Sequence, residues 1–171
     1  MHLDYPLQQH ARHRAEPFQL AFVYRARSIL GTPDDCLLKV SGRGLTLLSR
    51  NEEALEAPTL VLRDVFGSAL ELSPMQVRLT GAPPQEPIMH LRVDAPVSHA
   101  QRVKRVLRRR SVEVADESFG RTRCTLRGKA PLTQLLGLSA EMKHVTLGSA
   151  LVWTALAGYA PCPLDPEPAA A

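Results

Sequence analysis

The segment from residue 86 to residue 163 alternates between strand and helix patterns in an order that few folds accommodate. A strand pattern at residues 88–93 precedes a helix pattern that begins between Ala95 and Ser98, and alternating segments at 111–115 and 121–126 are typical of an antiparallel hairpin. A second helix pattern begins at Pro131, and an apolar strand pattern ends the series. Strand, helix, hairpin, helix, strand is the order of the ferredoxin-like split βαββαβ fold, so the sequence predicts an α+β protein with this fold at residues 86–163.

The two predicted helices each have an apolar face that can pack on the sheet. The packing positions of the first helix are Ala100, Val103, Val106 and Leu107. Those of the second helix are Leu132, Leu135, Leu136 and Ala140. Residues 151–157 are almost wholly apolar, which favours a strand buried beside a neighbour over one at an exposed edge.

Positive charge is concentrated in the same part of the sequence. Residues 97–129 hold ten Lys or Arg against three acidic residues, a net charge of +7, whereas the rest of the chain sums to −3. Such a concentration is the usual signature of a polyanion-binding site. The alternative is a solvated helix face, on which salt screens the repulsion and the arginine stems cover apolar surface. The side of the first helix opposite its apolar face carries Arg102, Lys104, Arg105, Arg108 and Arg109.

The sequence upstream of residue 86 predicts a different kind of structure. Residues 1–17 have little apolar content and are predicted to form a flexible arm. Residues 18–80 contain short apolar segments at 18–26, 36–49, 59–67 and 69–80, which predict a small, mostly antiparallel β-rich domain with a hairpin at Gly42-Arg43-Gly44. Residues 51–57 are also compatible with a single helical turn. At the other end of the chain, closely spaced prolines predict that residues 164–171 are disordered.

No residue pattern in the sequence supports a metal site, a cofactor or an enzymatic activity. Cys36, Cys124 and Cys162 are far apart and form no metal-type or disulfide-type pattern. The histidines have no ligand spacing, and no serine lies in a G-x-S-x-G motif. No apolar run approaches the roughly 20 residues of a membrane span, and the first residues lack the apolar core of a signal peptide. A cytoplasmic protein with no cofactor and no catalytic role is therefore expected.

Four short motifs in the predicted βαββαβ segment occur in the arrangement of one known family. They are Glu86-Pro87-Ile88-Met89, Leu107-Arg108-Arg109-Arg110, Leu136-Gly137 and Thr146-Leu147-Gly148. With these motifs the segment resembles the C-terminal domain (domain V) of elongation factor G. The 171 residues contain no G-x-x-x-x-G-K-[ST] motif for binding nucleotide phosphates. The resemblance is therefore to the C-terminal domain alone and does not extend to the GTPase domain of the family.

The resemblance implies a ferredoxin-like domain that contacts the ribosome or ribosomal RNA. Carried onto this sequence, it implies that Arg105, Arg108 and Arg109 face the RNA, with Arg110 and the turn of Thr146 and Gly148 as secondary candidates. The family usually has glycine in the turn after its three arginines, where this chain has Ser111.

The leading hypothesis is a non-enzymatic binding module that contacts structured RNA through phosphate contacts from the first helix. The alternative is a protein-interaction adaptor with no nucleic-acid role, in which the β-rich domain binds another protein. Recognition of single-stranded RNA by the sheet surface is disfavoured, because the predicted third strand at residues 121–127 lacks the stacking aromatics that such sites use.

Overall fold

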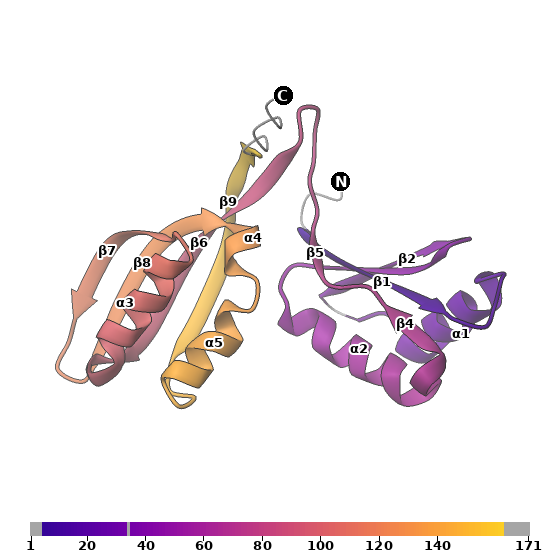
Figure 1. The fold of residues 1–171 in the computed structure, drawn as a ribbon, viewed down its shortest axis with the longest axis horizontal. Coiled ribbons are helices and arrows are strands. Elements are labelled where there is room, and N and C mark those ends of the chain that lie inside the picture. The colour runs from indigo at the N-terminus through magenta and orange to yellow at the C-terminus, as the bar shows by residue number, and fades with distance from the viewer. Residues whose placement is uncertain (1–4, 34, 163–171) are drawn as a thin grey trace, which may run out of the picture. The chain divides into compact units, whose positions relative to one another are not determined.

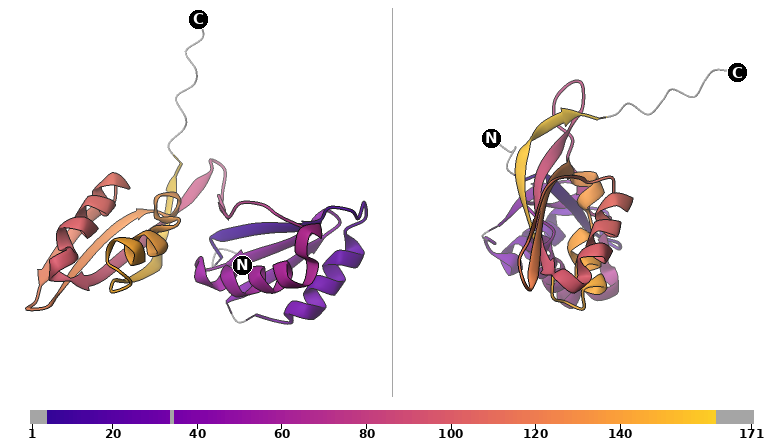
Figure 2. Two further views of the ribbon diagram at one scale, coloured as in Figure 1. Left: turned by 60° about the horizontal axis from the view of Figure 1, so that its bottom comes forward. Right: turned by 90° about the vertical axis from the view of Figure 1, so that its left-hand side faces the viewer.

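The computed structural model describes residues 5–33 and 35–162, and the chain divides into two compact units, Met1–Arg78 and Leu79–Ala171 (Figure 1). Each unit contains a strand, a helix, a hairpin, further helical structure and a strand in that order. In each unit the helices pack on one face of an antiparallel sheet (Figure 2). The same topology therefore occurs twice along the chain.

The N-terminal unit is built around β1, a strand in the middle of its sheet. The strands lie in the order β2-β3-β1-β4, β5 also pairs with β1, and each of these pairings is antiparallel. The hairpin predicted at Gly42-Arg43-Gly44 joins β2 to β3. The elements are β1 (Leu7–His13), α1 (Leu20–Leu30), β2 (Cys36–Ser41), β3 (Gly44–Ser49), α2 (Glu53–Phe66), the 3-10 turn η1 (Gly67–Ala69), β4 (Leu70–Leu72) and β5 (Gln76–Val77).

Two segments of this unit that the sequence predicts as strands are helices. The strand predictions at residues 18–26 and 59–67 are wrong, because α1 and α2 occupy most of them, and α2 begins inside the segment where a helical turn is the alternative. Aromatic and β-branched residues favour strands locally, but packing against the sheet outweighs this propensity. The buried side chains Phe22, Val23 and Ala26 follow helical spacing, and the rings of Phe22 and Phe66, with centroids 4.9 Å apart, join the two helices.

The prediction that residues 1–17 form a flexible arm is wrong for residues 7–13, which are β1. Only Leu7 and Ala11 of this strand are buried, so its apolar pattern is too sparse to recognise in the sequence. Polar side chains complete its packing instead. The Gln9 amide donates to the Ser73 carbonyl at 2.9 Å and accepts from Thr59 Oγ1 at 3.1 Å.

The C-terminal unit has the predicted βαββαβ order. Its strands lie in the order β7-β8-β6-β9, and each neighbouring pair is antiparallel. The predicted disordered tail, residues 164–171, lies outside the described residues. The elements are β6 (Gln85–Pro96), the 3-10 turn η2 (Val97–His99), α3 (Ala100–Arg109), β7 (Glu113–Phe119), β8 (Arg123–Pro131), α4 (Leu132–Leu135), α5 (Leu138–Val145) and β9 (Leu151–Pro161).

The core of this unit lies between the sheet and α3 and α5. The four apolar positions predicted for the first helix are all buried. The second predicted helix is broken into α4 and α5 at Leu136-Gly137, where Gly137 has a φ of +73° that ends a regular helix. Its predicted apolar stripe is correct for Leu132 and Leu135 but not for Ala140, which is exposed, and Leu138 and Met142 are buried beyond the break.

The last strand, β9, is an edge strand, so the prediction that residues 151–157 are buried beside a neighbour is wrong. Within the described ranges β9 pairs with β6 alone. Leu151, Trp153 and Leu156 are exposed at 53%, 47% and 39%. An apolar composition therefore indicated burial where the strand in fact presents apolar side chains to solvent.

The turn after α3 stores backbone strain. Ser111 has a φ of +53°, a conformation that glycine adopts at little cost. The Ser111 and Val112 amides donate to the carbonyls of Arg108 and Leu107, both at 3.0 Å, which is the Schellman arrangement of a helix end. The family that this segment resembles usually has glycine at this turn, and this geometry fits that preference.

Replacing Ser111 by glycine should stabilise the protein. We expect Ser111→Gly to raise the free energy of unfolding by about 0.5–1 kcal/mol, because it relieves the left-handed conformation of a residue with a Cβ atom. Urea denaturation measures the change. Ser111→Ala is the matched control, since it removes the hydroxyl but keeps Cβ and should bring no gain. An equal gain from alanine would show that the hydroxyl, not the backbone conformation, sets the cost.

Candidate RNA-binding surface

The cations of α3 divide into two groups that the sequence does not distinguish. Arg102, Arg105 and Arg108 are exposed on the outer side of the helix, three residues apart, and form what we call the exposed arginine row. No ion pair involves any of the three in the part of the chain that the structure describes. These guanidinium groups are therefore free to meet an anion.

Lys104 belongs to the other group. Its ammonium forms an ion pair with Glu117 of β7 and lies 5.0 Å from the centre of the Phe119 ring. The side chain is only 17% exposed. Lys104 therefore joins the helix to the edge of the sheet and is not directed at an external ligand.

Arg109 and Arg110 both bind Glu141 of α5. Arg109 stays largely exposed, whereas the Arg110 guanidinium turns inward and lies 2.7 Å from Glu141. Arg110 also donates to the carbonyls of Gln134 and Leu136, at 2.9 and 2.7 Å, which satisfies backbone acceptors at the end of α4. Arg110 therefore has a structural role, and Arg109 combines an internal ion pair with surface exposure.

The turn between α5 and β9 places its two predicted residues differently. Thr146 is fully buried; its hydroxyl donates to the Met142 carbonyl at 2.7 Å and accepts from the Ala150 amide at 3.0 Å. Its side chain is therefore inside the protein, where RNA cannot reach it. Gly148 is exposed with a φ of +79°, next to Leu147, which is 84% exposed and also has positive φ.

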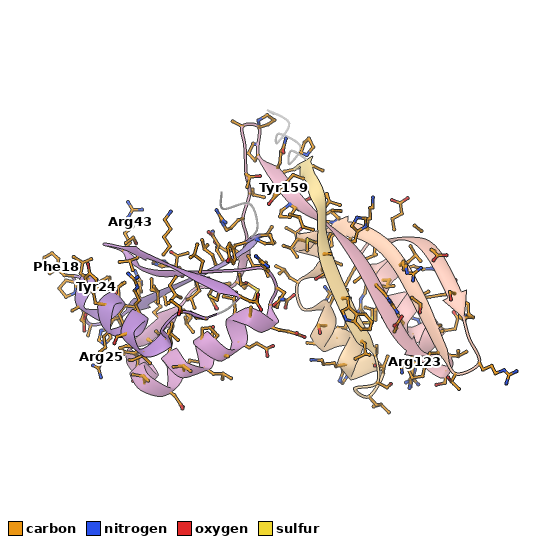
Figure 3. All side chains as sticks on the ribbon, turned by 180° about the vertical axis from the view of Figure 1, so that it is seen from behind. Phe18, Tyr24, Arg25, Arg43, Arg123 and Tyr159 are labelled. Carbon is orange, nitrogen blue, oxygen red and sulfur yellow. The ribbon has the colours of Figure 1, made fainter. Side chains whose placement is uncertain are left out.

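Sequence reasoning missed a group of residues on the sheet face opposite the helices. Arg92 and Trp153 lie side by side on β6 and β9, and Arg123 and Arg127 lie on β8. Arg123, marked in Figure 3, donates to the carbonyls of Asp94 and Ser149 at 3.0 and 3.2 Å. The alternation of polar residues along β6 and β8 was the signal that could have shown this face in the sequence.

Hydrogen bonds from Arg92 hold the pKa of Asp94 below its ordinary value. The two side chains are linked at 2.7 and 3.3 Å, and the ion pair raises the pKa of Arg92 in turn. Asp94 is therefore charged at neutral pH and fixes the orientation of the Arg92 guanidinium.

The N-terminal unit has cations around the end of β1. Arg12, Arg14 and Arg43 border an open hollow, and Arg43 is marked in Figure 3. Arg12 binds Glu71 at 2.9 Å, and this hydrogen bond lowers the pKa of Glu71. The unit as a whole holds nine Lys or Arg and nine Asp or Glu, so it has no net charge. Residues 79–171, by contrast, hold twelve basic against eight acidic residues.

Other kinds of site find little support. No group of three or more His, Cys, Asp or Glu side chains that could hold a metal ion occurs among the described residues. Cys36 and Cys124 are buried, and burial raises the pKa of the Cys36 thiol to about 11. Residues 5–33 and 35–162 include no helix with the length and apolar character needed to cross a membrane.

Comparison with known proteins identifies the C-terminal unit. The family model of the elongation factor G C-terminus matches residues 84–169, half of the chain. The chain belongs to this family. A search of curated proteins gives no match. The elongation factor G C-terminus is a non-catalytic domain.

A solved structure shares the fold over most of the chain. The crystal structure of ttk003000868 from Thermus thermophilus is similar over 94% of this chain, with a TM-score of 0.65 and 14% sequence identity. At this identity the likeness shows the fold alone. The chain spans 41% of the length of that protein.

Replacing Arg110 should destabilise this elongation factor G C-terminal domain. We expect Arg110→Ala to lower the free energy of unfolding by about 2 kcal/mol, because two carbonyls lose their donor and the Glu141 carboxylate keeps Arg109 alone. Arg110→Lys should recover only part of the loss, since an ammonium cannot reproduce the planar fork. Arg108→Ala is the matched control and should change stability by less than about 0.5 kcal/mol. Equal effects of the two alanine substitutions in urea denaturation would contradict the structural role.

Proposed function

We propose that this chain is a non-enzymatic, GTPase-free binding module that contacts ribosomal RNA through α3. The observation that carries the proposal is the exposed arginine row, Arg102, Arg105 and Arg108, which has no internal ion pair in the described ranges. Membership in the elongation factor G C-terminus family supports a link to the ribosome. The excess of basic residues in this unit alone supports it as well.

The spacing of the exposed arginine row suits a phosphate backbone. The three arginines are spaced along the length of a ten-residue helix, one every three residues. Each guanidinium can donate two parallel hydrogen bonds to a phosphate. Contacts of this kind recognise the shape of a folded RNA and carry little information about its sequence. Arg109 and the Gly148 turn are secondary candidates. The charge of Arg109 is partly neutralised by its ion pair with Glu141.

The pattern of internal ion pairs favours ligand binding over a merely solvated helix face. Lys104 and Arg108 are four residues apart, as are Arg105 and Arg109, and like charges at this spacing repel by roughly 0.2–0.5 kcal/mol per pair. In each pair one cation is neutralised by an internal carboxylate: Glu117 binds Lys104, and Glu141 binds Arg109. The other member of each pair stays exposed, where its charge can bind a ligand.

A protein-interaction adaptor is the second candidate, and one observation favours it. The N-terminal unit exposes large apolar side chains on its helices and the turn before α1, including Phe18 at 83% and Tyr24 at 62% (Figure 3). Exposed apolar groups of this kind are typical of protein contact sites. This candidate predicts a complex that survives nuclease treatment and high salt, in contrast to the RNA proposal.

Replacing two arginines of the exposed row tests the RNA proposal. We expect Arg105→Ala/Arg108→Ala to weaken binding to a ribosomal RNA stem-loop and to flatten the dependence of log K on log salt by about two, because two phosphate contacts are lost. Fluorescence anisotropy of the labelled RNA over a salt series gives the slope. Sucrose-gradient sedimentation measures binding of the unmodified protein to intact ribosomes, and we expect high salt to abolish this binding.

The matched control is Arg27→Ala/Arg63→Ala, which removes the same charge from exposed positions of α1 and α2. It should leave the salt slope unchanged. If both double variants weaken binding equally, the effect comes from net charge and the proposed surface is wrong. A complex with ribosomes that resists high salt would favour the adaptor.

A further inference from the structure

The C-terminal sheet has a second surface, on the side away from α3 and α5 (Figure 2). Because side chains alternate along a strand, the buried Met89, Leu91 and Val93 face the helices and the intervening His90, Arg92 and Asp94 face the opposite side. The register then places Trp153 and Ala155 of β9 and Arg127 and Lys129 of β8 on that same side. We call this surface the open sheet face.

Trp153 and Arg92 form a pair of flat groups on the open sheet face. The two residues are direct cross-strand partners, and the guanidinium carbon lies 5.1 Å from the centre of the indole ring. Asp94 holds the guanidinium through two hydrogen bonds. Almost half of the Trp153 side chain nevertheless remains exposed. The pair of Trp153 and Arg92 therefore forms a platform of fixed orientation on which a flat ligand can stack.

A shallow hollow lies beside this pair. It is lined by His90, Leu91, Arg92, Arg127, Gly128, Trp153, Thr154 and Ala155. The small side chain of Ala155, next to His90 across the strands, leaves room above the sheet. Both arginines of the lining are ion-paired, Arg92 with Asp94 at 2.7 Å and Arg127 with Asp116 at 3.3 Å. Lys129 nearby is exposed and has no ion-pair partner in the described part of the chain. The hollow thus combines a stacking group with cations.

We propose that the open sheet face binds an unpaired nucleobase of single-stranded RNA, which stacks on Trp153 and Arg92 while Lys129 meets an adjacent phosphate. Stacking on aromatic or guanidinium planes, together with nearby cations, is how proteins hold single strands. This inference rests on the proposed function for the choice of RNA as ligand, but it uses different residues and a different face of the unit from the exposed arginine row.

The expectation that the sheet surface does not bind single strands came from one strand only. Residues 121–127 lack aromatics, which is correct for β8. The stacking group comes instead from β9, the strand expected to be buried, and its planar partner comes from β6. Only the register that brings Trp153 opposite Arg92 reveals the pair.

Trp153 is the only tryptophan of the chain, so its fluorescence reports directly on the proposed site. We expect an eight-nucleotide oligoadenylate to quench this fluorescence saturably in the full chain. An abasic oligomer of the same length has the same phosphates but no bases, and it should not quench. Failure of the oligoadenylate to quench, or equal quenching by the abasic oligomer, would overturn the proposal.

Variants at the platform test the same inference without tryptophan fluorescence. We expect Trp153→Leu to weaken binding of labelled oligoadenylate about tenfold by anisotropy, because a stacking partner is lost. Trp153→Phe should retain most of the affinity, which separates loss of stacking from loss of fold. The matched control is Phe119→Leu, since Phe119 is an exposed aromatic of β7 that lies beside Lys104. Equal losses in the Trp153→Leu and Phe119→Leu variants would refute a specific site.

The two proposed RNA-binding surfaces can be tested independently of each other. Arg105→Ala/Arg108→Ala should leave quenching by oligoadenylate unchanged, whereas Trp153→Leu should leave binding of a fully paired stem unchanged. Loss of oligoadenylate binding in the arginine variant would show that a single surface serves both ligands and would contradict a separate site on the open sheet face.

Discussion

Glu141 of α5 accepts hydrogen bonds from Arg109 and Arg110, and this contact fixes the end of α3 against the second helical segment of the C-terminal unit. A guanidinium suits this position because its planar fork donates in several directions at once, here also to the carbonyls that end α4. Glu117 of β7 binds Lys104 in a similar way. Each carboxylate takes a cation that would otherwise add to the repulsion along the helix, and both are distant in sequence from the residues that they bind. Tertiary structure therefore selects the exposed arginine row as the cations of α3 that remain available.

The sequence predicted the C-terminal unit far better than the N-terminal one, and the reason is physical. The apolar positions of α3 recur with clear helical spacing between strongly basic residues, so its buried face could be assigned correctly. In α1 and α2, aromatic and β-branched residues lie on exposed as well as buried positions, and the resulting apolar runs resemble strands. In β1, a central strand uses glutamine side chains where apolar ones are usual.

The candidate site was predictable only in its location on α3. A helical wheel places charges on a face but says nothing of partners from other elements, so Lys104 and Arg109 looked equivalent to Arg105. Thr146 was misplaced for a similar reason: its hydroxyl satisfies backbone groups at a helix end, a task that short sequence motifs do not reveal.

The two faces of the C-terminal unit offer different chemistry to a nucleic acid. Arginines on a helix meet phosphates, whose spacing depends on the fold of the RNA, whereas a flat pair on a sheet meets bases, which are accessible only where the RNA is unpaired. Because α3 and the open sheet face lie on opposite sides of one sheet, a single short stem cannot contact both. An RNA that engages the whole unit would therefore need a paired region and an unpaired one, which is a stricter requirement than either surface imposes alone.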